Sequence, residues 1–145
     1  MKTPQQSLLV APDPSSPRVV RVKLTVPYPP SVNEIYRHTA KFGRVVKYKT
    51  TEHREYVGAV GNAVRRAQLH DPLIDTFPFT GPVALTIRIY RPAKRGDLDN
   101  RIKAIQDALN QVAWLDDAQI VAIHAYRFDD KANPRADLEI EGEVP

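Results

Sequence analysis

The spacing of apolar residues changes repeatedly along this chain, and that pattern limits the fold more than any other feature. Apolar and polar residues alternate through residues 20–26 and again through residues 83–89, which predicts two strands with one buried face each. From Thr50 or Thr51 to about Leu69 the apolar residues recur at helical spacing instead. Strands and helices with one apolar face must bury those faces against one another, so the pattern predicts a sheet covered by helices.

A second helix and two more strands are predicted in the C-terminal half. The helix has an apolar stripe, formed by Leu98, Ile102, Ile105, Leu109 and Val112. Residues 120–128 and 136–141 have the pattern of strands, with a turn signal at Asn133-Pro134 between them. The order β-α-β-α-β-β predicts a single small α/β (α+β) domain with one mixed β-sheet, in which the last two strands form an antiparallel pair.

Length and composition indicate the domain organisation. The 145 residues suit one domain, because domains typically run about 100–200 residues. Residues 1–17 are rich in Pro, Ser and Gln and predict a flexible N-terminal arm, so the folded domain is expected at residues 18–145. No apolar run has the length of a secretory signal or a membrane span, which predicts a cytoplasmic protein without membrane contact.

Several kinds of site are excluded by residue type or motif. The chain has no cysteine, which excludes disulfides, thiolate metal sites and a cysteine nucleophile. It also has no Walker loop, no dinucleotide-binding glycine pattern and no intact calcium loop. The histidines lack ligand spacing and are interpreted as surface or packing residues: His38, His53, His70 and His124. Trp114 is interpreted as a core residue.

A segment rich in basic residues precedes the first helix. Residues 36–49 contain no acidic residue, and aromatic residues are interleaved with the basic ones. The basic residues are Arg37, Lys41, Arg44, Lys47 and Lys49. The net charge of the chain is only +4, but a cluster of this kind favours contact with nucleic acid phosphates from a loop or a hairpin. A solvated loop without a ligand is the alternative.

Acidic residues gather around the second predicted helix. Asp97 and Asp99 lie at its start, and Lys103 lies four residues beyond Asp99 on the same face. Asp116 and Asp117 precede the next strand. A helix followed by a reversal is expected to return Asp117 close to Asp97 and Asp99, so that the carboxylates converge at one end of the sheet.

Such a cluster of carboxylates suits a hard cation. Mg²⁺ prefers oxygen ligands, takes few carboxylates and leaves positions for water and phosphate. The chemistry that this donor set favours is metal-dependent hydrolysis of a phosphodiester. Lys103 is the candidate for stabilising charge on the phosphate, while Lys94 and Arg95 are candidates for holding the flanking phosphates.

The same residues also have a purely structural explanation. Asp97 is a suitable N-cap, and Asp99 complements the helix dipole and can pair with Lys103. Asp116 and Asp117 suit a polar turn before a strand. Spacing alone therefore does not separate a metal site from an ordinary helix start.

Three segments of the chain form a combined signature. They are Arg95-Gly-Asp-Leu-Asp-Asn-Arg-Ile-Lys103, Gln106-Asp-Ala-Leu109 and Trp114-Leu-Asp-Asp-Ala-Gln-Ile120. Together with Pro27-Tyr-Pro-Pro-Ser-Val-Asn33 they resemble the RusA family of Holliday junction resolvases, also called crossover junction endodeoxyribonucleases. The resemblance extends over roughly Lys23 to Glu141. The combination of the two aspartate motifs is specific, whereas either motif alone is not.

The resemblance implies a homodimeric, Mg²⁺-dependent endonuclease that recognises four-way DNA junctions and nicks two opposing strands symmetrically. Mn²⁺ is an alternative cation, and no organic cofactor is implied. Carried over by position, Asp97, Asp99 and Asp117 are the catalytic carboxylates and Lys103 is the essential lysine. Asp116 is the partner aspartate of the last motif and is counted with these carboxylates as a metal ligand.

One departure and two alternatives stand beside this hypothesis. Gly96 takes a position where members of the family often have a further basic residue, which weakens any inference about how tightly DNA is held. The first alternative is a catalytically silent dimer that binds branched DNA. The second is a metal-dependent phosphohydrolase that acts on nucleotides or single strands.

Overall fold

A four-stranded mixed sheet is the centre of the molecule in the computed structural model, which describes residues 15–31, 36–41 and 43–144 and only the backbone of 36–41 and 44–49. The strands are β1 (Arg18–Pro27), β4 (Val83–Arg91), β5 (Ile120–Asp129) and β6 (Arg135–Val144). Their order is β1-β6-β4-β5. β5 runs parallel to β4, and the other neighbours are antiparallel, so the mixed sheet expected from the sequence is confirmed.

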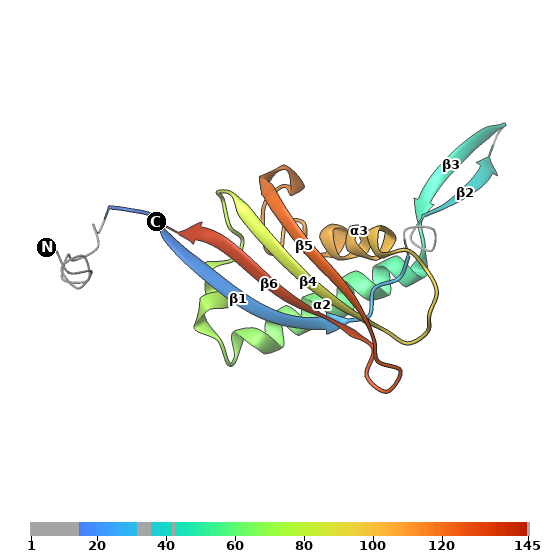
Figure 1. Ribbon diagram of the computed structural model, residues 1–145. Helices are drawn as coiled ribbons and strands as arrows, with labels where there is room; N and C mark the ends of the chain where they lie inside the picture. The colour runs from blue at the N-terminus through green and yellow to red at the C-terminus, as the bar shows by residue number, and fades with distance from the viewer. Residues whose placement is uncertain (1–14, 32–35, 42, 145) are drawn as a thin grey trace, which may run out of the picture.

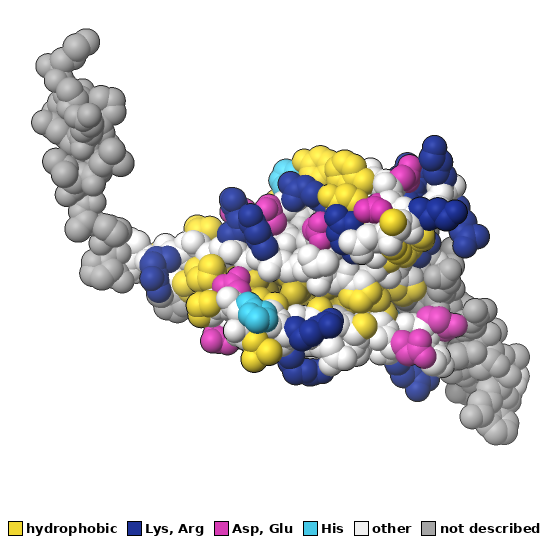
Figure 2. Space-filling view, turned by 90° about the horizontal axis from the view of Figure 1, so that it is seen from below, with side chains coloured by type: hydrophobic (Ala, Val, Ile, Leu, Met, Phe, Trp, Pro, Cys, Tyr) yellow, Lys and Arg dark blue, Asp and Glu magenta, His cyan; other side chains and the backbone are white. Residues whose placement is uncertain are grey.

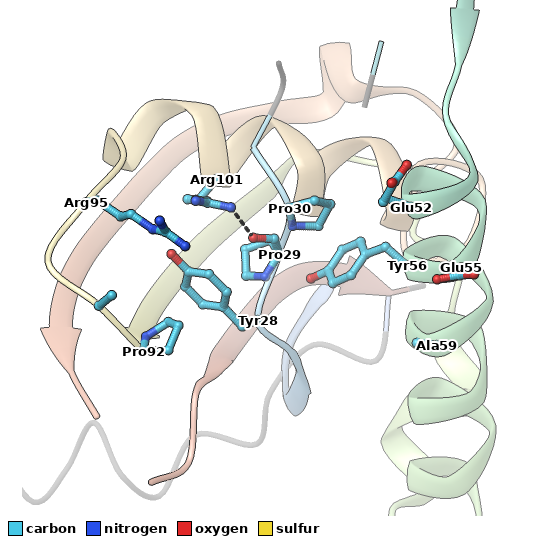
Figure 3. A pocket seen from close by; sticks show the side chains of 11 residues that line it. Tyr28, Pro29, Pro30, Glu52, Glu55, Tyr56, Ala59, Pro92, Arg95 and Arg101 are labelled. Carbon is cyan, nitrogen blue, oxygen red and sulfur yellow. Dashed lines mark hydrogen bonds between the residues drawn. The ribbon is translucent and has the colours of Figure 1, made fainter. Parts of the chain in front are cut away.

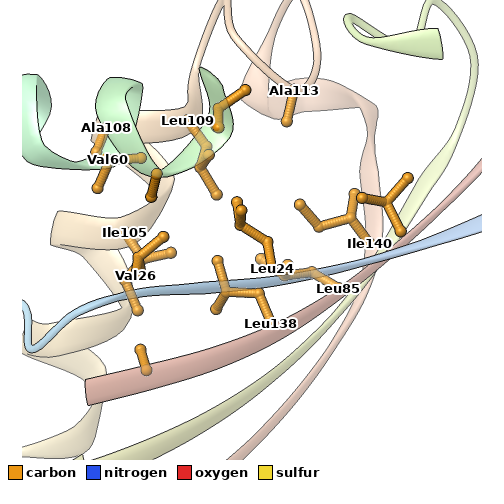
Figure 4. Close-up of a cluster of buried hydrophobic side chains, with 14 of the residues drawn as sticks. Leu24, Val26, Val60, Leu85, Ile105, Ala108, Leu109, Ala113, Leu138 and Ile140 are labelled. Atoms are coloured by element: carbon orange, nitrogen blue, oxygen red, sulfur yellow. The ribbon is translucent and has the colours of Figure 1, made fainter. Parts of the chain in front are cut away.

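Two helices cover one face of this sheet (Figures 1 and 4). Helix α2 (Thr51–Gln68) begins after Thr50, whose side chain accepts a hydrogen bond from the His53 amide. Helix α3 (Leu98–Leu109) ends earlier than the predicted stripe, because the chain turns at Gln111 with φ 67°. The core forms where the helices meet the sheet, and it includes Leu24, Val60, Leu85, Ile105 and Leu138. Within the described residues, the short 3₁₀ helices are η2 (Pro72–Thr76) and η3 (Asp117–Gln119).

The last two strands do not pair with each other, so that part of the prediction is wrong. β6 lies between β1 and β4, and β5 is at the edge of the sheet. Charge complementarity explains the arrangement, because Glu141 on β6 faces Arg21 on β1 at 2.7 Å. Glu139 lies between Lys23 of β1 and Arg88 of β4, at 3.9 and 4.0 Å. Strand β5 offers β6 no comparable set of charges.

The basic segment forms a hairpin, one of the two conformations expected for it. Strands β2 (Tyr36–Lys41) and β3 (Arg44–Lys49) pair antiparallel in a separate two-stranded sheet. Gly43 takes φ 72° in the connection, a conformation that glycine adopts without steric cost. Figure 1 shows the hairpin projecting from the start of α2, at the end of the molecule where α3 also begins.

The path from β4 through α3 to β5 determines where the acidic residues lie. The chain leaves the C-terminal end of β4, returns along α3 and enters β5 parallel to β4 (Figure 1). The start of α3 and the start of β5 therefore lie at opposite ends of the sheet. None of the helices among the described residues is long and apolar enough to cross a membrane.

Candidate active site

The loop after β4 presents two carboxylates to solvent. Gly96, with φ 86°, ends the loop, and Asp97 follows as the N-cap residue of α3. The Asp97 side chain makes no capping hydrogen bond, so the structural explanation for this residue is not supported. Asp99 is exposed in the first turn, and among the described residues neither carboxylate has a hydrogen bond or ion pair. Both carboxylates are accessible to a ligand from solution.

Lys103 does not form the expected pair with Asp99. Its Nζ lies 2.8 Å from Oδ1 of Asp107, one turn further along α3. The Asp107 side chain is only 13% exposed, and its Oδ2 is buried without a hydrogen-bond partner among the described residues. The spacing of four residues between Lys103 and Asp107 could have revealed this pair from the sequence.

Asp116 and Asp117 have different environments. Asp116 caps η3, since its Oδ1 accepts from the Ala118 amide and its own amide donates to Gln119 Oε1. This is the turn role that the structural explanation gave it. Asp117 accepts a hydrogen bond of 2.8 Å from Nε1 of Trp114, which confirms that the fully buried Trp114 lies in the core beside this turn.

The structure does not bring Asp117 together with Asp97 and Asp99 in one chain. The side-chain Nε2 of Gln119 donates to the carbonyls of Phe79 and Gly81, so this turn lies beside the segment before β4. Asp97 follows the other end of β4, and the 12 residues of α3 separate the two places by about 18 Å. The expected convergence within a chain is wrong, because a helix that connects parallel strands returns the chain to the opposite end of the sheet. Among described residues, no three His, Asp or Glu side chains gather as a metal site.

Basic residues surround the acidic pair. Lys94 and Arg95 are exposed in the loop directly before Asp97. The side chains of the five basic residues of the hairpin lie outside the described residues, and only their backbone can be placed, in β2 and β3. On the face shown in Figure 2, the described basic and acidic side chains are interspersed.

A cavity of about 410 Å³ opens between the first turn of α3, the start of α2 and the segment after β1 (Figure 3). Arg101 connects its walls, because it donates a hydrogen bond of 2.8 Å to the Pro29 carbonyl and lies 4.9 Å from the centre of the Tyr28 ring. Tyr56 donates to the Pro27 carbonyl at 3.0 Å, and burial raises the pKa of its hydroxyl. The sequence analysis did not identify this cavity, although it identified Tyr28 and Pro29 in a motif.

Comparison with known proteins assigns the chain to a family. The sequence matches the family described as Endodeoxyribonuclease RusA over residues 27–141. The chain belongs to the RusA family. The crossover junction endodeoxyribonuclease RusA of Escherichia coli strain K12 is 34% identical over 119 residues, which cover 81% of this chain and 91% of that relative. The protein of the same name from Enterobacteria phage 82 has the same identity and coverage.

A third relative supports the same assignment. The crossover junction endodeoxyribonuclease RusA of Escherichia coli O139:H28 strain E24377A is 36% identical over 100 residues, or 68% of this chain and 75% of the relative. The RusA match runs from the last residue of β1 to Glu141 in β6, and so includes every candidate catalytic, metal-binding and DNA-binding residue. Membership in an endodeoxyribonuclease family, expected from the aspartate motifs, is confirmed.

Proposed function

We propose that this protein is a metal-dependent, structure-selective endodeoxyribonuclease that resolves four-way DNA junctions by paired nicks in recombination or repair. We propose the cytoplasm as its location. The observation that carries the proposal is the pair Asp97 and Asp99, which are exposed and have no partner within the described part of this RusA-family chain. Asp99 in the first turn of α3 also complements the helix dipole, but Asp97 makes no capping hydrogen bond, so the dipole alone does not account for both carboxylates beside Lys94 and Arg95.

The donor set of this pair fits Mg²⁺ or Mn²⁺. Both cations prefer oxygen ligands, and Mg²⁺ is commonly held by one or two carboxylates together with water and phosphate oxygens. Asp97 and Asp99 would hold the cation, and their carboxylates have no competing partner among the described residues. The chemistry that such a cation supplies is Lewis acidity toward a phosphoryl oxygen and a lowered pKa of bound water.

Lys103 and the basic loop act on the DNA phosphates in this proposal. Lys103 is held by Asp107 on α3, and in this proposal its ammonium stabilises negative charge on the reacting phosphate. Lys94 and Arg95 would hold phosphates next to the cleaved one. The hairpin of β2 and β3 would contact an arm of the junction with Arg37, Lys41, Arg44, Lys47 and Lys49.

We infer a homodimer with a shared site, and the position of Asp117 supports this inference. The edge strand β5 carries exposed apolar side chains, with Val121 71% and Ile123 40% exposed, and so offers a surface for a second copy. If two β5 edges meet antiparallel about a two-fold axis, the start of β5 in one copy lies beside the end of β5 in the other. That arrangement brings Asp117 of one copy, with Asp116 beside it, toward the acidic pair of its partner.

The proposal is tested with a labelled four-way junction and a matched linear duplex, each with Mg²⁺ and with EDTA. We expect symmetric nicks in the junction alone, dependent on the cation and lost in Asp99→Asn. Asp75→Asn is the matched control, because Asp75 is also an exposed aspartate but lies in η2 and is not part of the acidic pair. Tight binding without nicks would support a silent binder instead, and equal cleavage of single strands or nucleotides would support a phosphohydrolase.

The shared site has its own test, which uses mixed dimers. Asp99→Asn and Asp117→Asn are each expected to be inactive alone. In a mixed dimer of the two variants, one site keeps Asp99 from one chain and Asp117 from the other, so single nicks are expected to return. Mixed dimers as inactive as either parent would place each site within one chain and contradict the shared arrangement.

A further inference from the structure

We propose that the cavity beside the first turn of α3 is a nucleobase site, which takes an unstacked base of the DNA strand next to the acidic pair. This inference rests on the proposed function and adds a specificity site to it. The cavity volume of about 410 Å³ lies within the range of roughly 300–1,000 Å³ typical of small-molecule sites. Figure 3 shows its walls, which come from the segment after β1, from α2, and from the loop and first turn of α3.

The apolar part of the cavity includes two tyrosine rings that are fixed in place. Tyr28, Pro29 and Tyr56 contribute to it. The Tyr28 ring is held by the Arg101 guanidinium at 4.9 Å from its centre, and the Tyr56 hydroxyl is held by the Pro27 carbonyl. The half-buried Tyr28 ring is the surface that would accept the flat face of a base, because aromatic side chains stack on all bases.

The charged part of the cavity favours a base over a phosphate. Arg95 and Arg101 line one side, and Glu52 and Glu55 line the side formed by α2 (Figure 3). The carboxylates would repel a phosphate, whereas the edge of a base carries both hydrogen-bond acceptors and amino donors. Guanidinium groups donate to base acceptors, and carboxylates accept from base amino groups.

The position of the cavity connects it with the cleavage site. Arg95 and Arg101 come directly before and after the segment Gly96–Asn100, which contains the acidic pair, and Arg101 lies against the turn at Gly96. A side-chain Cβ at Gly96 would lie 3.1 Å from Nη2 of Arg101, so the absence of a side chain there leaves room for the guanidinium. A strand whose phosphate reaches Asp97 and Asp99 therefore passes the mouth of the cavity.

Only an unstacked base can enter such a cavity. Extracting a base from an intact duplex costs unpairing and unstacking, and the cost is least where the stack is already interrupted. The crossover of a four-way junction interrupts the stack. The cavity would therefore add selectivity for the crossover and, through its polar groups, for the base at one position beside the nick.

The test uses four-way junctions with 2-aminopurine at each position around the crossover, in EDTA so that no strand is cut. We expect wild-type protein to change the fluorescence at one position. Tyr28→Leu and Glu55→Gln are each expected to reduce this change by about fivefold or more, because the first removes the stacking ring and the second replaces a charged acceptor of a base amino group with a neutral amide. Glu55 is exposed on α2, so Glu55→Gln keeps the test valid if Tyr28→Leu fails to fold.

Two variants serve as matched controls. Phe77→Leu removes a half-buried ring before the start of β4, and Glu143→Gln removes an exposed carboxylate from β6. Both are expected to keep the full fluorescence change. No responding position, or a response that survives in both Tyr28→Leu and Glu55→Gln, would overturn the proposal.

The readout also separates this inference from the proposed function. A fluorescence change that depends on Tyr28 and Glu55 would support the base site even if wild-type protein with Mg²⁺ cut no junction, in which case the proposed nuclease activity alone would fail. Cation-dependent nicking without any change of this kind would support the nuclease and overturn the base site.

Discussion

Asp107 gives Lys103 a partner on the buried side of α3. Lysine has a long flexible side chain, and an exposed ion pair typically contributes only about 0.2–1 kcal/mol to stability. The Asp107 side chain is only 13% exposed, however, so its environment restricts where the Lys103 ammonium can lie. We infer that Asp107 is a positioning residue, which acts on the reaction through Lys103.

The first prediction concerns this pair. Asp107→Asn is expected to lower the rate of junction nicking about tenfold and to change junction affinity little, because orientation of a charged group affects the transition state more than binding. Single-turnover nicking and equilibrium binding measure the two effects. Combined with Lys103→Ala, the Asp107→Asn change should have no further effect on the rate. Additive losses would show that Asp107 does not act through Lys103.

The second prediction concerns Gly142 in β6. A Cβ at this position would lie 2.4 Å from Cγ of Phe79, whose ring is buried in the core. Gly142→Ala is therefore expected to lower the free energy of unfolding by about 1–3 kcal/mol, as other overpacked cores do. Gly58→Ala on α2 is the control, because its Cβ would meet nothing within 4 Å and alanine favours a helix. Denaturant unfolding measures the stability of both variants. A Gly142→Ala protein as stable as wild type would contradict this packing.

At the scale of elements, β5 combines an unpaired edge with exposed apolar side chains. Val121 is 71% exposed, and the ladder to β4 is interrupted beside it, where the register shifts between Val83 and Ala84. A long apolar edge strand is a hazard for a protein that stays monomeric. The second copy proposed for this edge would remove the hazard and give the strand a role in assembly.

The third prediction tests this edge. Val121→Glu is expected to convert the dimer to a monomer and to abolish paired nicking, because a charge would be buried in the contact between copies. Leu69→Glu is the control, since Leu69 is 79% exposed at the end of α2, which lies on another part of the molecule. Sedimentation equilibrium measures the mass. A Val121→Glu protein that remains dimeric and nicks normally would exclude β5 from the interface.

The elements were easier to predict from the sequence than their arrangement. The alternation of apolar residues gave β4 correctly, since one of its faces is buried and the other is half-buried. The place of β6 was missed because period-two spacing does not say which strand is the neighbour. Its partner was nevertheless indicated by charge, since Glu141 and Glu139 face Arg21 and Lys23 of β1.

The candidate site was predicted in its residues and not in its geometry. Asp97 and Asp99 could be found from the sequence because they share one helix start. The position of Asp117 depends on the direction of β5 relative to β4, which only the sheet topology reveals. The cavity at Tyr28 and Arg101 was missed because its residues are far apart in the sequence.

At the scale of the whole molecule, the basic residues differ in how close they lie to acidic residues, which affects how well they can bind DNA phosphates. The net charge is +4, and the described charges are interspersed over the face shown in Figure 2. The hairpin of β2 and β3 is different, because residues 36–49 contain no acidic residue and project from the end of the molecule where α3 begins (Figure 1). A duplex arm held at the acidic pair would extend past this hairpin.

The last prediction compares two pairs of basic residues at opposite ends of α2. Lys41 and Lys47 lie in the hairpin before its start, whereas Arg65 and Arg66 lie in its last turn. The 18 residues of α2 separate these places by about 27 Å. Each lost phosphate contact reduces the slope of log affinity against log salt by about 0.9, so replacing Lys41 and Lys47 with alanine should reduce it by about 1.8. Replacing Arg65 and Arg66 in the same way should leave the slope of junction binding unchanged, and equal slopes for the two double variants would remove the hairpin from the DNA interface.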